Sequence, residues 1–428
     1  MITAGLCTSS AMINIADEAE TPYALIQLDD RITVNISPIE FDRMAQVAES
    51  TDSVMVYADF FEINDDEQNL HPLNDYLYGS VRDDFDFGPL VLINTSALRK
   101  ASISLPDLEH AGWYATRLAL SRIGKITHIP EPLYSASKPD ATSQFDYVDP
   151  RNRTVQKEME LAFTHHLSKL GALLSPPFAS FEPIGEFPVE ASVIIPVKNR
   201  VKTVAKAIES ALGQDTDFKF NIIVVDNHST DGTTELLGEL AANDNRIHHL
   251  IPNCKTLGIG GCWNLAINSD VCGRYSIQLD SDDLYSSPMT LQRIVDCFRQ
   301  EKAAMVIGSY QLTDFNLNPI PPGVIDHSEW TDHNGPNNAL RINGLGAPRA
   351  FCTELVRRHP FPNTSYGEDY AMALRLSRSY KLARIFDVLY LCRRWDGNSD
   401  AALSIEKANR FNHYKDSIRT WELSARTK

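Results

Sequence analysis

The sequence predicts an α/β protein whose larger domain, residues 189–402, is built on a doubly wound, mostly parallel sheet. From residue 192 onward, short apolar runs typical of buried strands alternate with amphipathic runs typical of helices. Polar clusters follow several of the strand-like runs where they end. The most acidic cluster, Asp280, Asp282 and Asp283, comes directly after the strand-like run 275–279. These three observations together place a binding site at one edge of the sheet.

Composition excludes several classes of function. The 428 residues are enough for two or three domains, and 43% of them are hydrophobic, as in globular proteins. A formal charge of −16 argues against nucleic acid as a partner. The sequence has no apolar run of the roughly 18 residues that a membrane span needs, and no signal-peptide pattern. Seven scattered cysteines without a C-x-x-C pair favour reduced thiols in the cytoplasm, with a peripheral position at the inner face of the membrane left open.

The first 150 residues contain their own strand-like and helix-like runs. The apolar periodicity predicts strands at 23–28, 53–57 and 90–93, and helices at 38–49 and 111–121.

A long helix and a proline-rich stretch separate the two halves of the chain. Residues 148–174 have the apolar stripe of an amphipathic helix. Ser175, Pro176 and Pro177 end it, and the following residues to 188 have the composition of a linker. The predicted organisation is therefore a domain at 1–150, a helix and linker at 151–188, a domain at 189–402 and a C-terminal helix at 403–428.

The second half alternates regularly between strand-like and helix-like runs. The pattern predicts, in order, a strand at 192–196, a helix at 201–212, a strand at 221–225, a helix at 233–242, and strands at 247–250 and 275–279. Polar clusters at 198–200, 226–229 and 280–282 fall at strand ends, where doubly wound sheets bind ligands.

The Asp-x-Asp at residues 280–282 is a candidate metal site. Carboxylates packed this closely repel one another unless a cation lies among them, and hard oxygen ligands suit Mg²⁺ or Mn²⁺ with substrate phosphates completing the shell. A solvated acidic turn is the alternative.

Five motifs in order resemble those of the family 2 glycosyltransferases. They are the runs 192–200, 224–233 and 258–266, the Asp-x-Asp, and Gly367-Glu368-Asp369. The resemblance implies the GT-A fold and an inverting transferase that moves a sugar from a nucleoside-diphosphate sugar, UDP- or GDP-linked, with Mn²⁺ or Mg²⁺. The implied acceptor is a saccharide or lipid-linked saccharide, in polysaccharide or glycoconjugate synthesis.

The resemblance also implies roles for single residues. The donor is expected to contact Pro196, Lys198, Asn199, Arg200, Asp226, Asp280, Arg393 and Arg394. Asp280 and Asp282 are the expected metal ligands, and Asp369 the general base with Glu368 beside it. The two arginines stand near the place where the family often has a histidine, which leaves the third metal ligand open.

Structural roles remain as alternatives for several of these residues. Asp226 could cap the turn that follows it, and Asp369 could be the N-cap of a helix. The run 344–348 lies where the family closes around the acceptor, but it could be a plain turn. The glycines at 258–261 do not open a helix directly after a strand, which argues against a dinucleotide fingerprint. They resemble the family's flexible lead into the next helix.

The first half repeats the later part of the second. Residues 23–30 echo 275–282, 54–57 match 305–308, 109–110 parallel 368–369, and 125–134 follow 381–390. Arg31 replaces the second carboxylate of the Asp-x-Asp, and His110 replaces the base. Residues 1–150 are therefore expected to be a degenerate, non-catalytic GT-A-like copy without the nucleotide-holding strands. We expect this copy to pack against the catalytic domain or to mediate homodimer formation.

Two other functions remain open. Nucleotidyl transfer shares the layout of the fold, but enzymes of that class have a glycine-rich loop where this chain has Pro-Val-Lys-Asn-Arg, residues 196–200. A non-catalytic nucleotide-sugar-binding scaffold is the other alternative, and the intact Asp280, Asp282 and Asp369 weigh against it.

Overall fold

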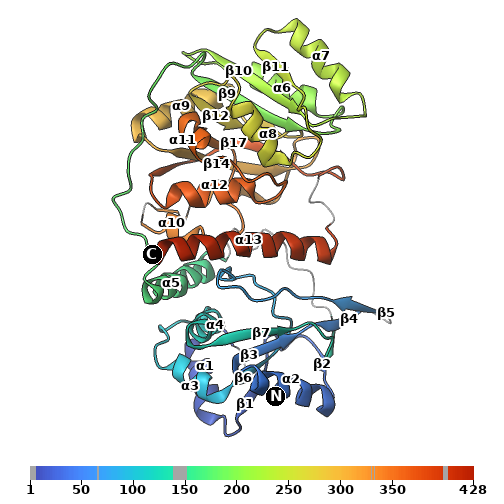
Figure 1. The fold of residues 1–428 in the computed structure, drawn as a ribbon, viewed down its shortest axis with the longest axis vertical. Coiled ribbons are helices and arrows are strands. Elements are labelled where there is room, and N and C mark those ends of the chain that lie inside the picture. Colours follow the sequence, from blue (N-terminus) through green and yellow to red (C-terminus); the bar gives the residue numbers. More distant parts are fainter. Residues whose placement is uncertain (1–5, 65–66, 138–151, 329, 332, 399–402) are drawn as a thin grey trace. The chain divides into compact units, whose positions relative to one another are not determined.

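The computed structural model describes residues 6–64, 67–137, 152–328, 330–331, 333–398 and 403–428 (Figure 1). The chain divides into two compact units. Unit 1 combines three segments, Met1–Leu174, Asn337–Asn343 and Leu403–Lys428. Unit 2 combines two, Ser175–Pro336 and Gly344–Ala402.

Unit 2 is a mixed α/β unit built on one nine-stranded sheet. Its strands are β9 (Ala191–Val197), β10 (Phe220–Asp226), β11 (Ile247–Leu250), β12 (Tyr275–Gln278), β13 (Leu284–Tyr285), β14 (Met305–Thr313), β15 (Pro319–Ile325), β16 (Arg349–Cys352) and β17 (Leu382–Arg393). Its helices are α6 (Val204–Leu212), α7 (Thr233–Asn243), α8 (Ile259–Ile267), α9 (Thr290–Glu301), α11 (Thr353–Arg358) and α12 (Glu368–Ser377). The short helix α10 (Gly335–Asn338) contains the point in the sequence, after Pro336, where the chain passes from unit 2 to unit 1.

The first four strands of unit 2 form the predicted parallel half of the sheet. They lie in the order β11-β10-β9-β12, all parallel, and β9 and β10 are buried along nearly their whole length. The crossovers through α6 and α7 run outward from β9, whereas the crossover through α8 runs back to β12. With one hand of crossover, α8 covers the opposite face from α6 and α7. This confirms the doubly wound α/β architecture, and its strands lie within one or two residues of the predicted bounds.

The sheet of unit 2 continues with strands that the sequence analysis did not place in order. Beyond β12 the order is β16-β14-β17-β13, with β15 on the outer half of β14. Strand β16 runs antiparallel between β12 and β14, while β14 and β17 are parallel and carry register shifts near Ile307 and Ser309.

Unit 1 is built on two four-stranded sheets. Its strands are β1 (Tyr23–Gln27), β2 (Val34–Asn35), β3 (Ser53–Ala58), β4 (Phe60–Asn64), β5 (Glu67–His71), β6 (Leu90–Asn94), β7 (Lys125–Ile129) and β8 (Ser135–Ser137). Its helices are α1 (Ser9–Glu18), α2 (Pro38–Ser50), α3 (Thr95–Ser102), α4 (Gly112–Ile123), α5 (Arg153–Leu170) and α13 (Ile405–Arg426).

The sheets of unit 1 repeat the strand order of the second half of unit 2. The order β1-β6-β3-β7 matches β12-β16-β14-β17, with the same antiparallel, antiparallel and parallel pairings. The second sheet, β2-β8-β4-β5, matches β13, the outer halves of β17 and β14, and β15. Unit 2 makes continuous, shifted strands where unit 1 divides each into two.

Unit 1 has no counterpart of β9, β10 and β11 among its described residues. In unit 2, β9 pairs with β12, and β10 and β11 follow on its far side, whereas in unit 1 the matching strand β1 has β6 as its one described neighbour. The described part of unit 1 thus has no strands at the positions of the nucleotide-holding strands that the first half was expected to lack.

The three segments of unit 1 meet in a core of buried charges. Arg341, which is 1% exposed, donates to Asp83 and to Gln156 Oε1 (2.7 Å). Arg419 donates to the Leu340 carbonyl (2.8 Å), and the fully buried Asp416 pairs with it. These contacts bind the segment 337–343 and α13 to the first segment of unit 1.

The long helix is shorter than predicted. It runs Arg153–Leu170, and Gly171 ends it in the left-handed conformation (φ 68°), which glycine adopts without strain. Residues 148–151 of the prediction lie outside the described residues. None of the described helices is long and apolar enough to cross a membrane.

Candidate active site

A cleft of about 410 Å³ opens in unit 2 at the carboxyl ends of β9 and β12. The loops after these strands, α8, β16 and the start of α12 contribute its walls. Of the residues predicted to act on substrate, it is lined by Pro196, Lys198, Arg200, Asp280, Asp282, Glu368, Asp369 and Arg394. Asn199, Asp226 and Arg393 do not line it. The cleft thus gathers residues from motifs that are up to 198 positions apart.

The acidic turn after β12 places carboxylates in a site shielded from water. Gln278 Nε2 donates to both carboxylate oxygens of Asp280 at 3.0 Å. Burial raises the pKa of Asp280 above its ordinary value, and the nearby charge of Asp282 adds to this rise. Burial also raises the pKa of Asp283 well above its usual range, and the charges of Asp280 and Asp282 act in the same direction.

Asp282 is engaged by the loop that follows β17. Its Oδ2 accepts hydrogen bonds from Asn398 Nδ2 (3.2 Å) and Trp395 Nε1 (3.3 Å), and lies 3.6 Å from Arg200 Nε. Arg200 also donates to the Gly397 carbonyl at 3.0 Å. The loop after β17 therefore reaches the Asp282 carboxylate through an indole and an amide, and Arg200, from the loop after β9, approaches the same oxygen.

The residues present fit a divalent metal. Asp280 and Asp282 supply carboxylate oxygens, the ligand type that Mg²⁺ and Mn²⁺ prefer. The raised pKa of Asp280 shows that its charge is costly in this site, first because of burial, and a cation would relieve that cost.

Asp226 is bound up in the turn after β10. It is fully buried, its Oδ1 accepts the Ser229 N–H (3.0 Å) and its Oδ2 accepts the Thr234 hydroxyl (2.5 Å). Burial alone would raise the pKa of Asp226, but these hydrogen bonds outweigh it and lower the pKa. Its neighbour Asn227 lines the cleft instead, and Asn227 Oδ1 accepts no hydrogen bond from the residues that the structure describes.

Asn199 and Arg393 hold loops together. Asn199 adopts a left-handed backbone (φ 55°), its N–H donates to Ser229 Oγ (2.9 Å), and its Oδ1 accepts the Thr230 N–H (2.8 Å). Arg393 is 1% exposed, and its N–H donates to Asp283 Oδ1 at 2.7 Å. Both residues fix the loops that carry the residues of the cleft.

Glu368 and Asp369 are the first two residues of α12. The N-cap is Gly367, with φ 79° and no side-chain cap, so the alternative that Asp369 is the N-cap is wrong. Asp369 Oδ1 accepts the Tyr370 N–H at 2.7 Å. The positive end of the helix dipole favours a negative charge at this position.

Arg349 is a charged residue of the cleft that the sequence analysis missed. Its Nη1 lies 2.8 Å from Asp369 Oδ2. A weak signal was present, because Arg349 directly follows the run 344–348 that was expected near the acceptor. Asn227 and Asn398 were missed as well, since neither belongs to a charged pattern.

The glycines of α8 serve close packing. Gly260 and Gly261 lie inside the helix, so the expected flexible lead is not observed. A Cβ on Gly260 would lie 2.0 Å from the Pro362 carbonyl oxygen and 3.0 Å from Glu368 Cβ. Gly260 thereby lets α8 approach the start of α12, where the two acids of the cleft begin.

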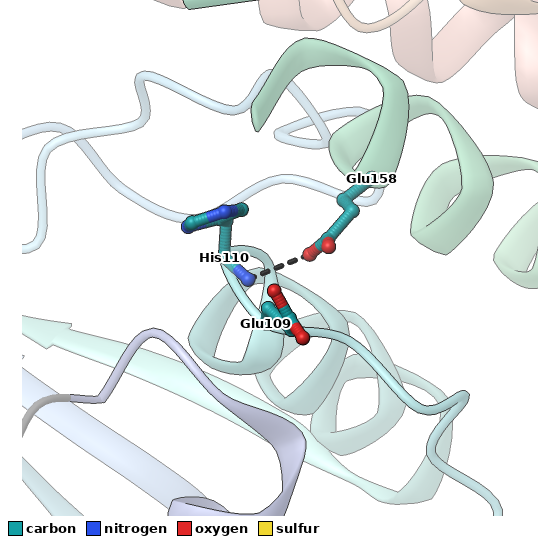
Figure 2. Close-up of side chains that lie close together, drawn as sticks. All are labelled: Glu109, His110 and Glu158. Carbon is teal, nitrogen blue, oxygen red and sulfur yellow. Dashed lines mark hydrogen bonds between the residues drawn. The ribbon is translucent and has the colours of Figure 1, made fainter. Parts of the chain in front are cut away.

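A second group of acidic and histidine side chains lies in unit 1. Glu109, His110 and Glu158 bring potential ligand atoms within 4.8 Å of one another (Figure 2). Glu158 Oε2 accepts the N–H groups of His110 (2.6 Å) and Ala111 (3.2 Å), just before α4. The methyl side chain of Ala111 cannot accept a hydrogen bond at the start of α4, so Glu158 of α5 supplies the acceptor. Helix capping accounts for this cluster.

The structure shifts the expected match between the two halves at this point. Glu109 and His110 precede the first residue of α4, whereas Glu368 and Asp369 begin α12. By helix start, Gly112 occupies the place of Glu368. Neither alignment puts an aspartate at the base position of unit 1.

Comparisons with known proteins identify part of unit 2. Residues 192–362 match the model of the family described as "Glycosyl transferase family 2". The chain is 36% identical over 231 residues to a chondroitin synthase of Escherichia coli, covering 53% of this chain and 32% of the relative. It is 26% identical over 227 residues to a hyaluronan synthase of Pasteurella multocida, covering 51% and 22%. The chain thus spans less than a third of the length of these relatives.

Among solved structures, residues 1–349 of S. aureus TarS in complex with UDP-GlcNAc align with a TM-score of 0.44 at 20% identity. The alignment covers 54% of this chain and 66% of that one.

Proposed function

We propose that this chain, whose residues 192–362 form a glycosyltransferase family 2 domain, transfers a sugar from a nucleoside-diphosphate sugar to a hydroxyl acceptor with inversion. One observation carries the proposal. The cleft at the carboxyl ends of β9 and β12 brings together Asp280, Asp282 and Asp369. The relatives are named for the synthesis of polysaccharides, which supports a saccharide or lipid-linked saccharide as the acceptor.

The donor would bind across the acidic turn. Asp280 and Asp282 would hold Mn²⁺ or Mg²⁺, which when bound supplies a Lewis acid for the departing UDP or GDP. Lys198, Arg200 and Arg394 line the same cleft and neutralise the negative charge of the diphosphate. The hydrogen bonds of Asp282 from Trp395 and Asn398 go to Oδ2, so its Oδ1 is the oxygen that would bind the metal.

The acceptor hydroxyl would attack the anomeric carbon from the side opposite the diphosphate. The new bond between the anomeric carbon and the acceptor oxygen forms as the bond to the diphosphate oxygen breaks, and this single displacement inverts the configuration. The acceptor proton passes to the Asp369 carboxylate. Asp369 is 30% exposed, so it can return the proton to water after each turnover.

Replacement of Asp369 by Asn tests the assignment of the base. Asn keeps the shape but cannot accept the proton, so kcat should fall by about 10²–10⁴-fold with donor affinity retained. Asp387, an exposed acid that pairs with Arg293, provides the matched Asp→Asn control and should keep full turnover. Near wild-type turnover by D369N would show that the base lies elsewhere.

The products separate the proposed function from its alternatives. Glycosyl transfer releases a nucleoside diphosphate, whereas nucleotidyl transfer releases pyrophosphate. A nucleotide-sugar-binding scaffold would bind the donor and release neither.

We also propose that residues 1–150 are a degenerate, non-catalytic copy of the second half of unit 2. The shared strand order supports this proposal. Arg31 donates to both carboxylate oxygens of Asp29, at 2.9 and 2.6 Å, so the position of the first acid carries its own counter-charge. The copy is therefore expected to bind no nucleotide, and isothermal titration of wild-type protein should give one donor per chain.

A further inference from the structure

Two adjacent carboxylates line the cleft, but their surroundings differ. Asp369 Oδ2 is 2.8 Å from Arg349 Nη1, and its Oδ1 accepts the Tyr370 N–H. Glu368 is 8% exposed, and its Oε2 accepts no hydrogen bond from the described part of the chain. Arg349 therefore forms an ion pair with Asp369, one member of the acidic pair.

Arg349 is itself held from two sides. Its backbone N–H donates to Gln278 Oε1 (3.1 Å), and its Nη1 donates to the Gly346 carbonyl (3.0 Å). Gly346 has φ 106°, a conformation that residues with a Cβ rarely adopt. A Cβ there would lie 2.9 Å from the Gly308 carbonyl oxygen. Because β16 lies inside the sheet between β12 and β14, the guanidinium begins from a rigid backbone.

Gln278 links this arginine to the acidic turn. Its side-chain oxygen accepts the Arg349 N–H, while its nitrogen donates to Asp280. Gln278 and Arg349 thus connect the proposed metal ligand Asp280 with the proposed base Asp369, through two hydrogen bonds of Gln278 and the ion pair of Arg349. The spacing between these two functions depends on the backbone of Arg349.

We propose that Arg349 is a positioning residue that fixes Asp369 as the ionised, proton-accepting member of the pair and leaves Glu368 to keep its proton. This inference rests on the proposed function, in which Asp369 is the base. Because Arg349 occupies Oδ2 and the Tyr370 N–H occupies Oδ1, the carboxylate is held in one orientation toward the acceptor.

The charges around the pair support this division. Burial raises the pKa of Glu368 to about 8, and the charge of Asp369 adds to the rise. Burial alone would lower the pKa of Arg349, but the acidic groups around it, Asp369 first and then Asp280, outweigh burial and raise the pKa. Arg349 is therefore a permanent cation in a site rich in acids, and Asp369 is the acid that it contacts.

The pH dependence of turnover tests the proposal. An opposite charge at this distance lowers a carboxyl pKa by about 1–3 units, so Arg349→Gln should move the acid limb of kcat/KM upward by at least about one unit. At pH 7, kcat should fall by about 10–100-fold. Donor affinity, measured by titration calorimetry, should change less than about threefold, because donor and metal contact other residues. Arg349→Lys keeps the charge, so its acid limb should lie close to that of the wild-type protein.

Control variants separate a charge effect from a disturbed loop. Arg384 Nη1 donates to the Leu345 carbonyl (2.8 Å) in the same loop, and its guanidinium lies over the Trp330 ring, 5.2 Å from the centroid. Arg384→Gln should therefore leave the acid limb in place, whatever it does to the rate. Glu368→Gln mimics the neutral acid, so it should lower kcat at least about tenfold less than D369N.

Each outcome decides one claim. If D369N keeps its turnover, the proposed base is wrong. If D369N is inactive but R349Q and R349K both keep the wild-type acid limb, Asp369 remains the base and the role of Arg349 is refuted. A loss in E368Q as large as in D369N would reverse the roles of the two acids. If R349Q does not fold, Arg349→Met, which keeps the length of the side chain and removes the charge, takes its place in the pH profile: a wild-type acid limb in that variant would refute the role of Arg349.

Discussion

Removal of the Asp282 carboxylate should abolish the stabilisation that a nucleotide gives in the presence of Mn²⁺. A ligand at 100 times its Kd stabilises the native state by about 2.7 kcal/mol. Unit 2 has about 220 residues, for which 1 kcal/mol shifts Tm by about 2–4 °C. The wild-type protein with its nucleotide and Mn²⁺ should therefore melt about 5–11 °C higher than without them. A 100-fold loss of affinity in Asp282→Ala leaves about 0.4 kcal/mol, a shift of roughly 1–2 °C.

The structure also shows why this shift must be measured against each variant without ligand. The Asp282 carboxylate accepts hydrogen bonds from Trp395 and Asn398, and its loss leaves both donors in a largely buried place. The loss of this acceptor for donors that stay largely buried costs about 1–3 kcal/mol, so the unliganded Asp282→Ala protein should itself melt lower.

Thermal melting with UDP and GDP, each with and without Mn²⁺, measures both effects, and Asp387→Asn is the control for loss of an acid. A Mn²⁺-dependent shift of wild-type size in Asp282→Ala would refute the metal site at the acidic turn.

Two further predictions concern packing and pH. Gly260→Ala should destabilise unit 2 by about 1–3 kcal/mol and lower turnover, because its Cβ would lie 2.0 Å from the Pro362 carbonyl oxygen. Gly238→Ala in α7, where a Cβ would meet nothing within 4 Å, should stabilise the unit by about 0.5–1 kcal/mol. Equal effects of the two variants in urea unfolding would contradict the packing argument. Burial lowers the pKa of His166 from 6.5 to about 3, so between these values the unfolded chain binds a proton that the folded chain does not, and stability should fall by about 2 kcal/mol from pH 7.5 to 5. His166→Gln should remove this dependence, and an unchanged pH profile would count against it.

The alternation of strands and helices in unit 2 was predictable because each element has a local pattern. Fully apolar runs such as residues 222–225 leave few options except a buried strand. The strands at 23–27, 53–58 and 90–94 were predictable for the same reason, because each has its own apolar pattern. The order β16-β14-β17 was not, because antiparallel insertion of β16 between β12 and β14 pairs segments about 45 to 75 residues apart.

The site was predictable where acids follow a strand, and less so where one side chain decides. Asp226 stands at a strand end like Asp280, but two donors within eight residues, the Ser229 N–H and the Thr234 hydroxyl, hold its carboxylate in the local turn. Arg349 has no repeated or charged pattern around it, and its partners Gln278 and Asp369 are distant in sequence. Such contacts depend on the folded sheet, so a single sequence does not reveal them.

The three visits of the chain to unit 1 determine the order in which a ribosome can complete the two units. Leu174 and Leu403 are separated by about 230 residues, which take roughly 10–50 s to synthesise. During that interval Arg82 lacks its ion pair with Asp416, and the nascent first segment carries a hydrated, unfinished core. Unit 2 is complete at Ala402, before α13 has been made. Of the two units, the one whose synthesis begins first is therefore the last to be completed.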